Sequence, residues 1–224
     1  MIQRKNLLHS YTVTDDIKSE YESAGVIALE CIFSSDEIDA FTDTHKGDIQ
    51  NQPHWSQSYL PSRESFMGDI SITDLLFGEK IKQIFSLLEV DMKLVVAEAR
   101  LASSRIGWHR DVTWETKGIP EYLVVSISMS DSDIEAGLIS YVPGSHLWNV
   151  DYEIVGREKI SGTGTNGYEY YENLIKSNNG IIKQFCSKKG DVLIWNGNMV
   201  HRGELESNQH AIRHSLTGHF VKSV

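Results

Sequence analysis

The sequence predicts a mainly β fold, a jelly roll with helices packed on it from the N-terminal part of the chain. From residue 92 onward, short runs rich in β-branched and aromatic residues alternate with polar or glycine-containing turns. Before residue 92, helix-capping residues precede segments with apolar residues at helical spacing. Many short strands with few helices between them are typical of antiparallel sheets in a sandwich or barrel.

The size and composition of the chain fit a folded globular protein. Its 224 residues suffice to bury a hydrophobic core without disulfide bonds or structural metals. The hydrophobic content of 40% and the charged content of 23% are ordinary for such proteins. We expect a single domain over residues 1–224, with a helical N-terminal layer over 1–91 and a jelly-roll core over 92–224.

The charge and the cysteines exclude several classes of partner. The formal net charge is -10 and no basic run occurs, which argues against nucleic acid because phosphate binding relies on clustered lysine and arginine. No apolar stretch approaches the length of a membrane span. Cys31 and Cys186 lack the spacing of a metal site, which favours reduced thiols. We therefore expect a cytoplasmic protein without membrane association.

The N-terminal part contains two capping signals. Residues 14–16 precede a first helix that Gly25 ends, and residues 34–37 have the pattern of a capping box before a second helix. Apolar residues at helical spacing after Gly78 predict a third, amphipathic helix. The expected elements are helices over 14–23, 34–47 and 78–90, with a strand over 26–29.

Short strands separated by turns make up most of the jelly-roll part. They are expected over 93–101, 122–129, 138–142, 181–185, 191–195 and 211–220. Two long segments, 48–63 and 156–180, have no sustained period, and we expect loops there. The second would be an insertion into the jelly-roll core. Loops of this length are often functional, although plain surface or disorder would also explain them.

His109 and Asp111 stand two residues apart at an expected strand end, so that both side chains point to the same side. An imidazole and a carboxylate aimed at one point are two parts of a 2-His-1-carboxylate facial triad, which holds non-haem Fe(II) with open positions. A tripeptide of this kind also occurs by chance, and a surface loop would explain it equally.

A third ligand is available at His201. Residues 190–203 have the pattern of a strand, a tight turn and the start of another strand, with His201 just past the turn. A jelly roll brings distant strands side by side, so His201 can lie opposite His109 and Asp111 although some ninety residues separate them.

Arg213 and Ser215 share one face of the last expected strand. A guanidinium with a hydroxyl beside it suits a carboxylate, which can accept two parallel N–H bonds and one O–H bond. A salt bridge between a buried Arg213 and a protein acid is the alternative.

Together these segments resemble the phytanoyl-CoA dioxygenase-like family of Fe(II)- and 2-oxoglutarate-dependent oxygenases. The resemblance runs over most of the chain and is carried by several motifs in the same order. They are the helix-strand-helix with 19–27 and 33–38, the tetrapeptide 108–111, the segment 137–146, Gly190-Asp191, His201, and Arg213 with Ser215.

The resemblance implies that His109, Asp111 and His201 bind Fe(II), and that Arg213 and Ser215 hold the distal carboxylate of 2-oxoglutarate. It implies a double-stranded β-helix, the cupin-like form of the jelly roll. The expected activity is hydroxylation of an unactivated C–H of a small-molecule metabolite, with consumption of O2 and release of succinate and CO2. Relatives that halogenate lack the carboxylate ligand, so Asp111 argues against a halogenase.

Residues around these motifs are weaker candidates. Trp108 and Trp114 could line the cavity or belong to the core, and Arg105 and Arg202 could meet an anionic substrate or be solvated charges. His146 follows a Pro-Gly-Ser turn and suits a structural role or the support of a metal ligand. The remaining histidines of the C-terminal part are interpreted as ordinary strand residues: His210, His214 and His219.

Two other functions stay open. One is a non-oxidative metal-dependent jelly-roll enzyme, a hydrolase or isomerase on the same three side chains, and the other is a catalytically silent binding module. Arg213 with Ser215 argues against both, because neither needs an anchor for a cosubstrate carboxylate. Fold does not choose the substrate, and the oligomeric state is equally open.

Overall fold

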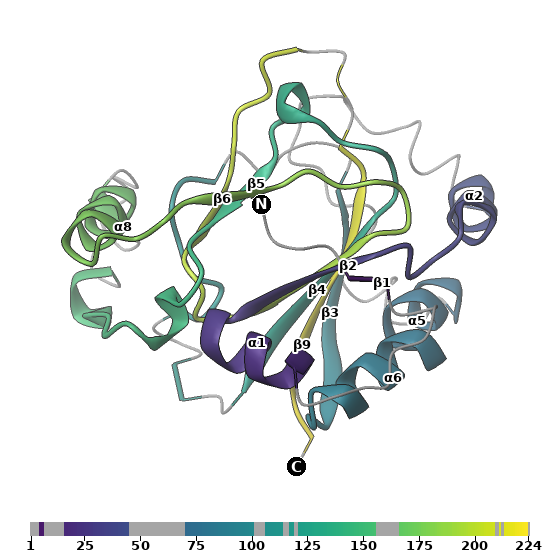
Figure 1. The fold of residues 1–224 in the computed structure, drawn as a ribbon, viewed down its shortest axis with the longest axis horizontal. Coiled ribbons are helices and arrows are strands. Elements are labelled where there is room, and N and C mark those ends of the chain that lie inside the picture. Colours follow the sequence, from purple (N-terminus) through teal and green to yellow (C-terminus); the bar gives the residue numbers. More distant parts are fainter. Residues whose placement is uncertain are drawn as a thin grey trace.

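The computed structural model of the protein describes residues 5–6, 16–44, 70–100, 106–113, 117–118, 121–155, 166–208, 211 and 213–223. Two mainly antiparallel sheets face each other, and helices cover the outer side of the larger one (Figure 1). The predicted mainly β jelly roll with packed N-terminal helices is confirmed.

The larger sheet has the strand order β1-β2-β7-β4-β9-β3. All its pairs are antiparallel except β1 with β2. Its strands combine the N-terminal layer with the jelly-roll part. They are β1 (Lys5–Asn6), β2 (Val26–Glu30), β7 (Val192–Asn196), β4 (Tyr122–Ser128), β9 (Ser215–Lys222) and β3 (Met92–Arg100).

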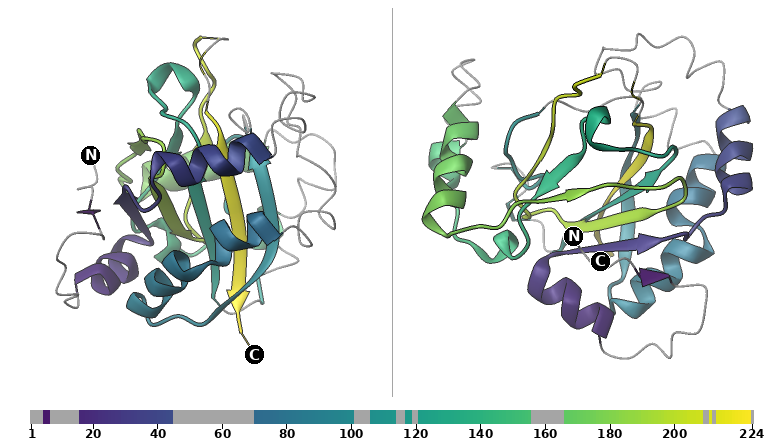
Figure 2. Two further views of the ribbon diagram at one scale, coloured as in Figure 1. Left: turned by 90° about the vertical axis from the view of Figure 1, so that its right-hand side faces the viewer. Right: turned by 45° about the horizontal axis from the view of Figure 1, so that its top comes forward.

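The smaller sheet contains β6 (Lys183–Phe185), β5 (Ile139–Tyr141) and β8 (His201–Gly203), in this order. It lies across the inner face of the larger sheet (Figure 2). One apolar cluster joins the two sheets, with Val124 and Leu193 from the larger and Tyr141 and Phe185 from the smaller. This cluster therefore holds the two sheets together.

The helices of the N-terminal layer are α1 (Asp16–Ala24), α2 (Ser35–Thr44), α5 (Ile70–Phe77) and α6 (Glu79–Leu87). Figure 2 shows α2, α5 and α6 crossing the outer face of the larger sheet. Their apolar sides form one cluster with that face, because α6 places Ile81, Ile84 and Phe85 on one stripe that meets Phe220 of β9.

A second helical region packs at the edge of the smaller sheet. The short helices η1 (Ile134–Ala136) and η2 (Ser145–Leu147) flank β5, and α8 (Asn166–Ser177) follows. Tyr171 and Ile175 of α8 lie four residues apart on one face and pack against Trp108 and Val200. This cluster supports the segment that precedes His109.

Most of the expected elements are present, with two corrections. The loop expected over 156–180 contains α8, because glycines and asparagines around the helix obscured the helical spacing of Tyr171, Leu174 and Ile175. The helix α5 was not predicted. The loop over 48–63 lies outside the described residues. The assignment of the whole chain to one domain stays a prediction.

Within the residues that the structure describes, no helix is both long enough and apolar enough to cross a membrane.

Candidate metal centre

Two backbone hydrogen bonds bring His109 and His201 together. The N–H of His109 donates to the carbonyl of His201 over 2.9 Å, and the N–H of His201 donates to the carbonyl of His109 over 3.0 Å. The two residues form an isolated antiparallel bridge at the start of β8. Pairing of the strand edges therefore joins two segments that are far apart in the sequence.

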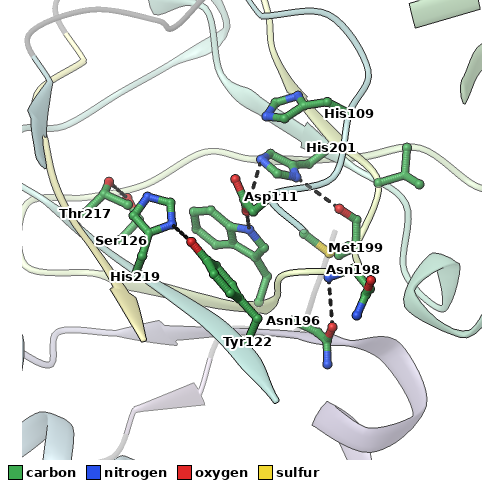
Figure 3. Close-up of polar contacts among 12 residues, drawn as sticks. His109, Asp111, Tyr122, Ser126, Asn196, Asn198, Met199, His201, Thr217 and His219 are labelled. Atoms are coloured by element: carbon green, nitrogen blue, oxygen red, sulfur yellow. Dashed lines mark hydrogen bonds and ion pairs between the residues drawn. The ribbon is translucent and has the colours of Figure 1, made fainter. Parts of the chain in front are cut away.

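His109, Asp111 and His201 each direct one ligand atom to a common point, and these atoms lie within 4.8 Å of one another (Figure 3). The Nε2 atom of His201 lies 3.7 Å from Oδ2 of Asp111. The centroids of the two imidazole rings are 4.2 Å apart. The three side chains that the sequence selected thus converge, and their role as metal ligands stays a prediction.

Both imidazoles are oriented by carbonyl groups of their own segments. Nδ1 of His109 lies 2.7 Å from the carbonyl oxygen of Gly107, and Nδ1 of His201 lies 3.1 Å from that of Met199. A carbonyl can only accept a hydrogen bond, so each Nδ1 carries the proton and each Nε2 keeps its lone pair. Such partners are typical of metal-ligating histidines, and the donor set therefore fits a divalent transition metal.

Asp111 is held in its ionised form. The indole N–H of Trp195 donates to Oδ2 of Asp111 over 2.7 Å. Burial raises the pKa of Asp111, but the positive charge that His201, His219 and His109 carry when protonated, together with the Trp195 hydrogen bond, lowers that pKa below its ordinary value. An anionic carboxylate beside two neutral imidazole nitrogens is the donor set of a facial triad.

Arg213 and Ser215 lie where β9 begins, and both are buried, with 7% and 9% of their surface exposed. The Nε and Nη1 atoms of Arg213 are buried. A buried cation next to a hydroxyl suits a carboxylate. Their contact with 2-oxoglutarate stays a prediction.

Other hydroxyl groups line the strands next to Ser215. They belong to Ser126 and Ser128 of β4 and Thr217 of β9, and all are buried. The Thr217 hydroxyl donates to Oγ of Ser126 over 3.3 Å (Figure 3). Serine and threonine in strands carry no distinctive spacing, so the sequence alone does not single out these residues.

The weaker candidates differ in their surroundings. Trp108 is 3% exposed and packs in the cluster beneath α8. The guanidinium of Arg202 lies 4.5 Å from the centroid of the Trp108 ring, and its Nε donates to Glu204 over 2.8 Å. The proposed contacts of both with substrate stay predictions. Arg105 and Trp114 lie outside the described residues.

His146 and Arg110 have structural surroundings. Nε2 of His146 lies 3.0 Å from the carbonyl oxygen of Glu22, and its ring covers Gly25 so closely that a side chain there would collide with it. Burial lowers the pKa of His146. Arg110 is buried and donates to the carbonyls of Ser145, over 2.5 Å, and of Trp148. Arg110, which no sequence motif singles out, ties the segment between two candidate ligands to η2.

His219 lies in β9 and contacts Tyr122. Its Nδ1 lies 3.1 Å from the Tyr122 hydroxyl, and its imidazole is among the groups that lower the pKa of Asp111. His210 lies outside the described residues, and His214 is half-buried just before β9.

Solved structures of other proteins have the same fold. The structure superposes on a non-haem alpha-ketoglutarate-dependent carbocyclase, SnoK from nogalamycin biosynthesis, with a TM-score of 0.72 and 15% identity, covering 94% of this chain and 85% of that one. The epimerase SnoN from the same biosynthesis gives a TM-score of 0.68 at 16% identity, covering 92% and 81%. At such identities the likeness shows the fold alone.

Sequence relatives point to one family. Phytanoyl-CoA dioxygenase domain-containing protein 1 from Mus musculus is 23% identical over 150 residues, which cover 64% of this chain and 50% of the relative. Its homolog from Dictyostelium discoideum is 27% identical over 95 residues, covering 42% and 33%. The matched part of the chain therefore spans half or less of the length of these relatives.

The family model for phytanoyl-CoA dioxygenase (PhyH) matches residues 77–215, which is more than half of the chain. The match includes His109, Asp111, His201, Arg213 and Ser215, the residues that form the candidate metal centre and the start of β9. The chain belongs to the phytanoyl-CoA dioxygenase (PhyH) family.

Proposed function

We propose that the protein is an Fe(II)- and 2-oxoglutarate-dependent oxygenase that hydroxylates an unactivated C–H of a small-molecule metabolite. The convergence of His109, Asp111 and His201 is the observation that carries this proposal. Membership of the PhyH family supports it, as do structural neighbours described as alpha-ketoglutarate-dependent.

The chain supplies a complete donor set for the metal. Nε2 of His109, Nε2 of His201 and one oxygen of Asp111 would hold Fe(II) on one face and leave its other positions for exogenous ligands. Arg213 and Ser215 would hold the distal carboxylate of 2-oxoglutarate through charge-assisted hydrogen bonds. The bound iron and cosubstrate supply the oxidation, in which O2 and 2-oxoglutarate give succinate, CO2 and one oxygen atom for the substrate.

The protein groups around this site contribute geometry. The carbonyls of Gly107 and Met199 fix the tautomer of both imidazoles, and Trp195 fixes the carboxylate of Asp111. The buried residues Arg213, Ser215 and Thr217 would shield bound 2-oxoglutarate from water. Preorganisation of this kind is what the fold adds to the chemistry of the metal.

The outcome of the oxidation is open to a direct measurement. Two structural neighbours are described as a carbocyclase and an epimerase, so the same fold supports reactions other than hydroxylation. The presence of Asp111 as a third donor favours oxygen transfer over halogenation. The mass of the product distinguishes the outcomes, because only hydroxylation adds one oxygen atom to the substrate.

Anaerobic addition of Fe(II) and 2-oxoglutarate tests the proposal. We expect a visible charge-transfer absorption band that requires both components, and its titration gives the dissociation constant for 2-oxoglutarate. A protein that binds neither would be no oxygenase, and turnover with zinc alone would support a non-oxidative metal enzyme. A screen for succinate release over a metabolite library would then identify the substrate.

A further inference from the structure

The inner face of β9 carries polar side chains that the candidate triad does not use. Ser215, Thr217 and His219 share this face, because successive residues of a strand point to opposite sides. The alternate residues Leu216 and Phe220 pack in the apolar cluster with the N-terminal helices. One face of the strand therefore serves the core, and the other lines the space between the sheets.

The metal centre lies level with the His219 end of this row. Asp111 accepts its hydrogen bond from Trp195 of β7. Trp195 and His219 both pair with Val124, which belongs to the strand between them. Arg213 precedes the first residue of β9, at the other end of this row. The stretch over Ser215 and Thr217 is thus left for a cosubstrate anchored at Arg213.

Burial changes along the same row. Arg213, Ser215 and Thr217 are all buried, whereas His219 and its neighbour Tyr122 are partly exposed. Asp111 and His109 are partly exposed as well. Among the described residues, this row is therefore buried towards Arg213 and partly exposed at His219, so a substrate would approach the metal from the His219 end.

Tyr122 fixes the orientation of His219. Its hydroxyl lies 3.1 Å from Nδ1 of His219, and the two rings meet edge to face with centroids 5.9 Å apart. Tyr122 itself packs on Gly197, where an added Cβ would lie 2.5 Å from its ring. The Gly197 carbonyl also accepts a hydrogen bond from Val112, next to Asp111. The pair is thus built into the turn that precedes His201.

We infer that His219, held by Tyr122, borders the metal centre on the side of the substrate, at the end opposite the cosubstrate anchor. Figure 3 shows Asp111 between His201 on one side and His219 on the other. The inference rests on the proposed function, and it assigns to His219 contact with whatever enters the remaining metal position.

Nitric oxide is a suitable probe, because it binds Fe(II) where O2 would bind. The protein is loaded anaerobically with Fe(II) and 2-oxoglutarate, nitric oxide is added, and the electron paramagnetic resonance spectrum is recorded. We expect His219→Phe and His219→Gln to change the rhombicity of the spectrum, with a smaller change for Tyr122→Phe. The affinity for 2-oxoglutarate should stay within about twofold, which corresponds to about 0.4 kcal/mol.

His214→Phe is the matched control, because this histidine lies just outside the same strand and should leave the spectrum unchanged. An unchanged spectrum in both His219 variants would overturn the inference. A large loss of 2-oxoglutarate affinity in them would also overturn it, by placing His219 at the cosubstrate. The substitutions His219→Gln and Tyr122→Phe roughly preserve the volume of the side chain. Melting temperatures check the folding of every variant. No absorption band in the wild-type protein would refute the proposed function itself.

Discussion

The two faces of β4 and β9 differ in what they hold together. The outer face is apolar and fully buried beneath the helices, and it presents Leu123, Val125, Ile127, Leu216 and Phe220. The inner face is largely polar, and it presents Ser126, Ser128, Ser215, Thr217 and His219 next to Val124. The same two strands therefore carry the main core on one side and the candidate site on the other.

This difference follows from the two-residue period of a strand. Alternate side chains leave the sheet in opposite directions, so one backbone can place an apolar residue and a functional residue next to each other without mixing them. Changes on the outer face should lower the free energy of unfolding and spare ligand affinity. Changes on the inner face and at the metal centre should do the reverse.

The largest effect on ligand binding is expected for Asp111→Ala. It removes the anionic donor of the triad, and we expect the loss of Fe(II) affinity to exceed the ~10–100-fold typical of losing a residue that only supports a ligand. Calorimetric titration with Mn(II), a redox-stable substitute, and assay of succinate release measure this. The unfolding free energy should change little. Continued succinate release by this variant would remove Asp111 from the triad. The control is Asp43→Ala, because Asp43 is exposed on α2.

On the outer face, Phe220→Ala should have the largest effect on stability. Phe220 is 0% exposed and packs edge-on against Phe85 with ring centroids 5.0 Å apart. Truncation of a buried phenylalanine lowers the free energy of unfolding by about 3–5 kcal/mol. Urea denaturation measures this change, and the neighbouring Val221→Ala, which is partly exposed, should cost clearly less. A weaker Fe(II) affinity in folded Phe220→Ala protein would argue against the separation of the faces.

Arg213→Ala should weaken 2-oxoglutarate binding by about 2–5 kcal/mol, the range for removing one partner of a buried charge pair. Arg213→Lys should recover only part of this, because lysine cannot form two parallel hydrogen bonds. The titration of the charge-transfer band measures both variants. Arg202→Ala is the control, since Glu204 and Trp108 already engage that side chain. If Arg213→Ala left the affinity unchanged, Arg213 would be structural.

The convergence at the metal centre could be predicted because it depends on the two-residue period of a strand and on the order of the strands along the chain. His109 and Asp111 share a side by strand alternation, and the strand-turn-strand pattern before His201 placed this histidine at the start of β8. The jelly roll followed from many short β-rich runs. These features are local patterns that the sequence displays directly, and the topology needed only to bring the strand edges together.

Other features depend on tertiary contacts that a single sequence does not display. His219 had no distinctive neighbours in the sequence, and its position beside Tyr122 follows from the register of β4 with β9. The helix α8 was hidden by glycines and asparagines near its ends, and packing of Tyr171 against Trp108 stabilises it. In both cases the contact partner lies far along the chain, so the local sequence pattern does not reveal the contact.

A moderate effect is expected for Trp195→Phe. The indole N–H that donates to Asp111 over 2.7 Å is lost, while the aromatic ring remains in the cluster between the sheets. Loss of such a supporting partner lowers metal affinity by ~10–100-fold. Comparison of Mn(II) affinity with the free energy of unfolding separates this role from packing. A purely structural Trp195 would show a lower stability at unchanged metal affinity.

The smallest effect is expected for Thr217→Val, which replaces a hydroxyl by a methyl group of similar volume. The hydrogen bond of 3.3 Å to Ser126 is lost, so the free energy of unfolding should fall by only about 0.5–1.5 kcal/mol. The affinity for 2-oxoglutarate should fall as well, because Thr217 lies between the metal centre and Arg213 on the inner face of β9. Urea denaturation and the titration of the charge-transfer band are compared for this variant and for the outer-face variant Leu216→Ala. Loss of stability without any loss of affinity in Thr217→Val would show that the inner hydroxyls serve the core, and the two faces would then differ in polarity but not in function.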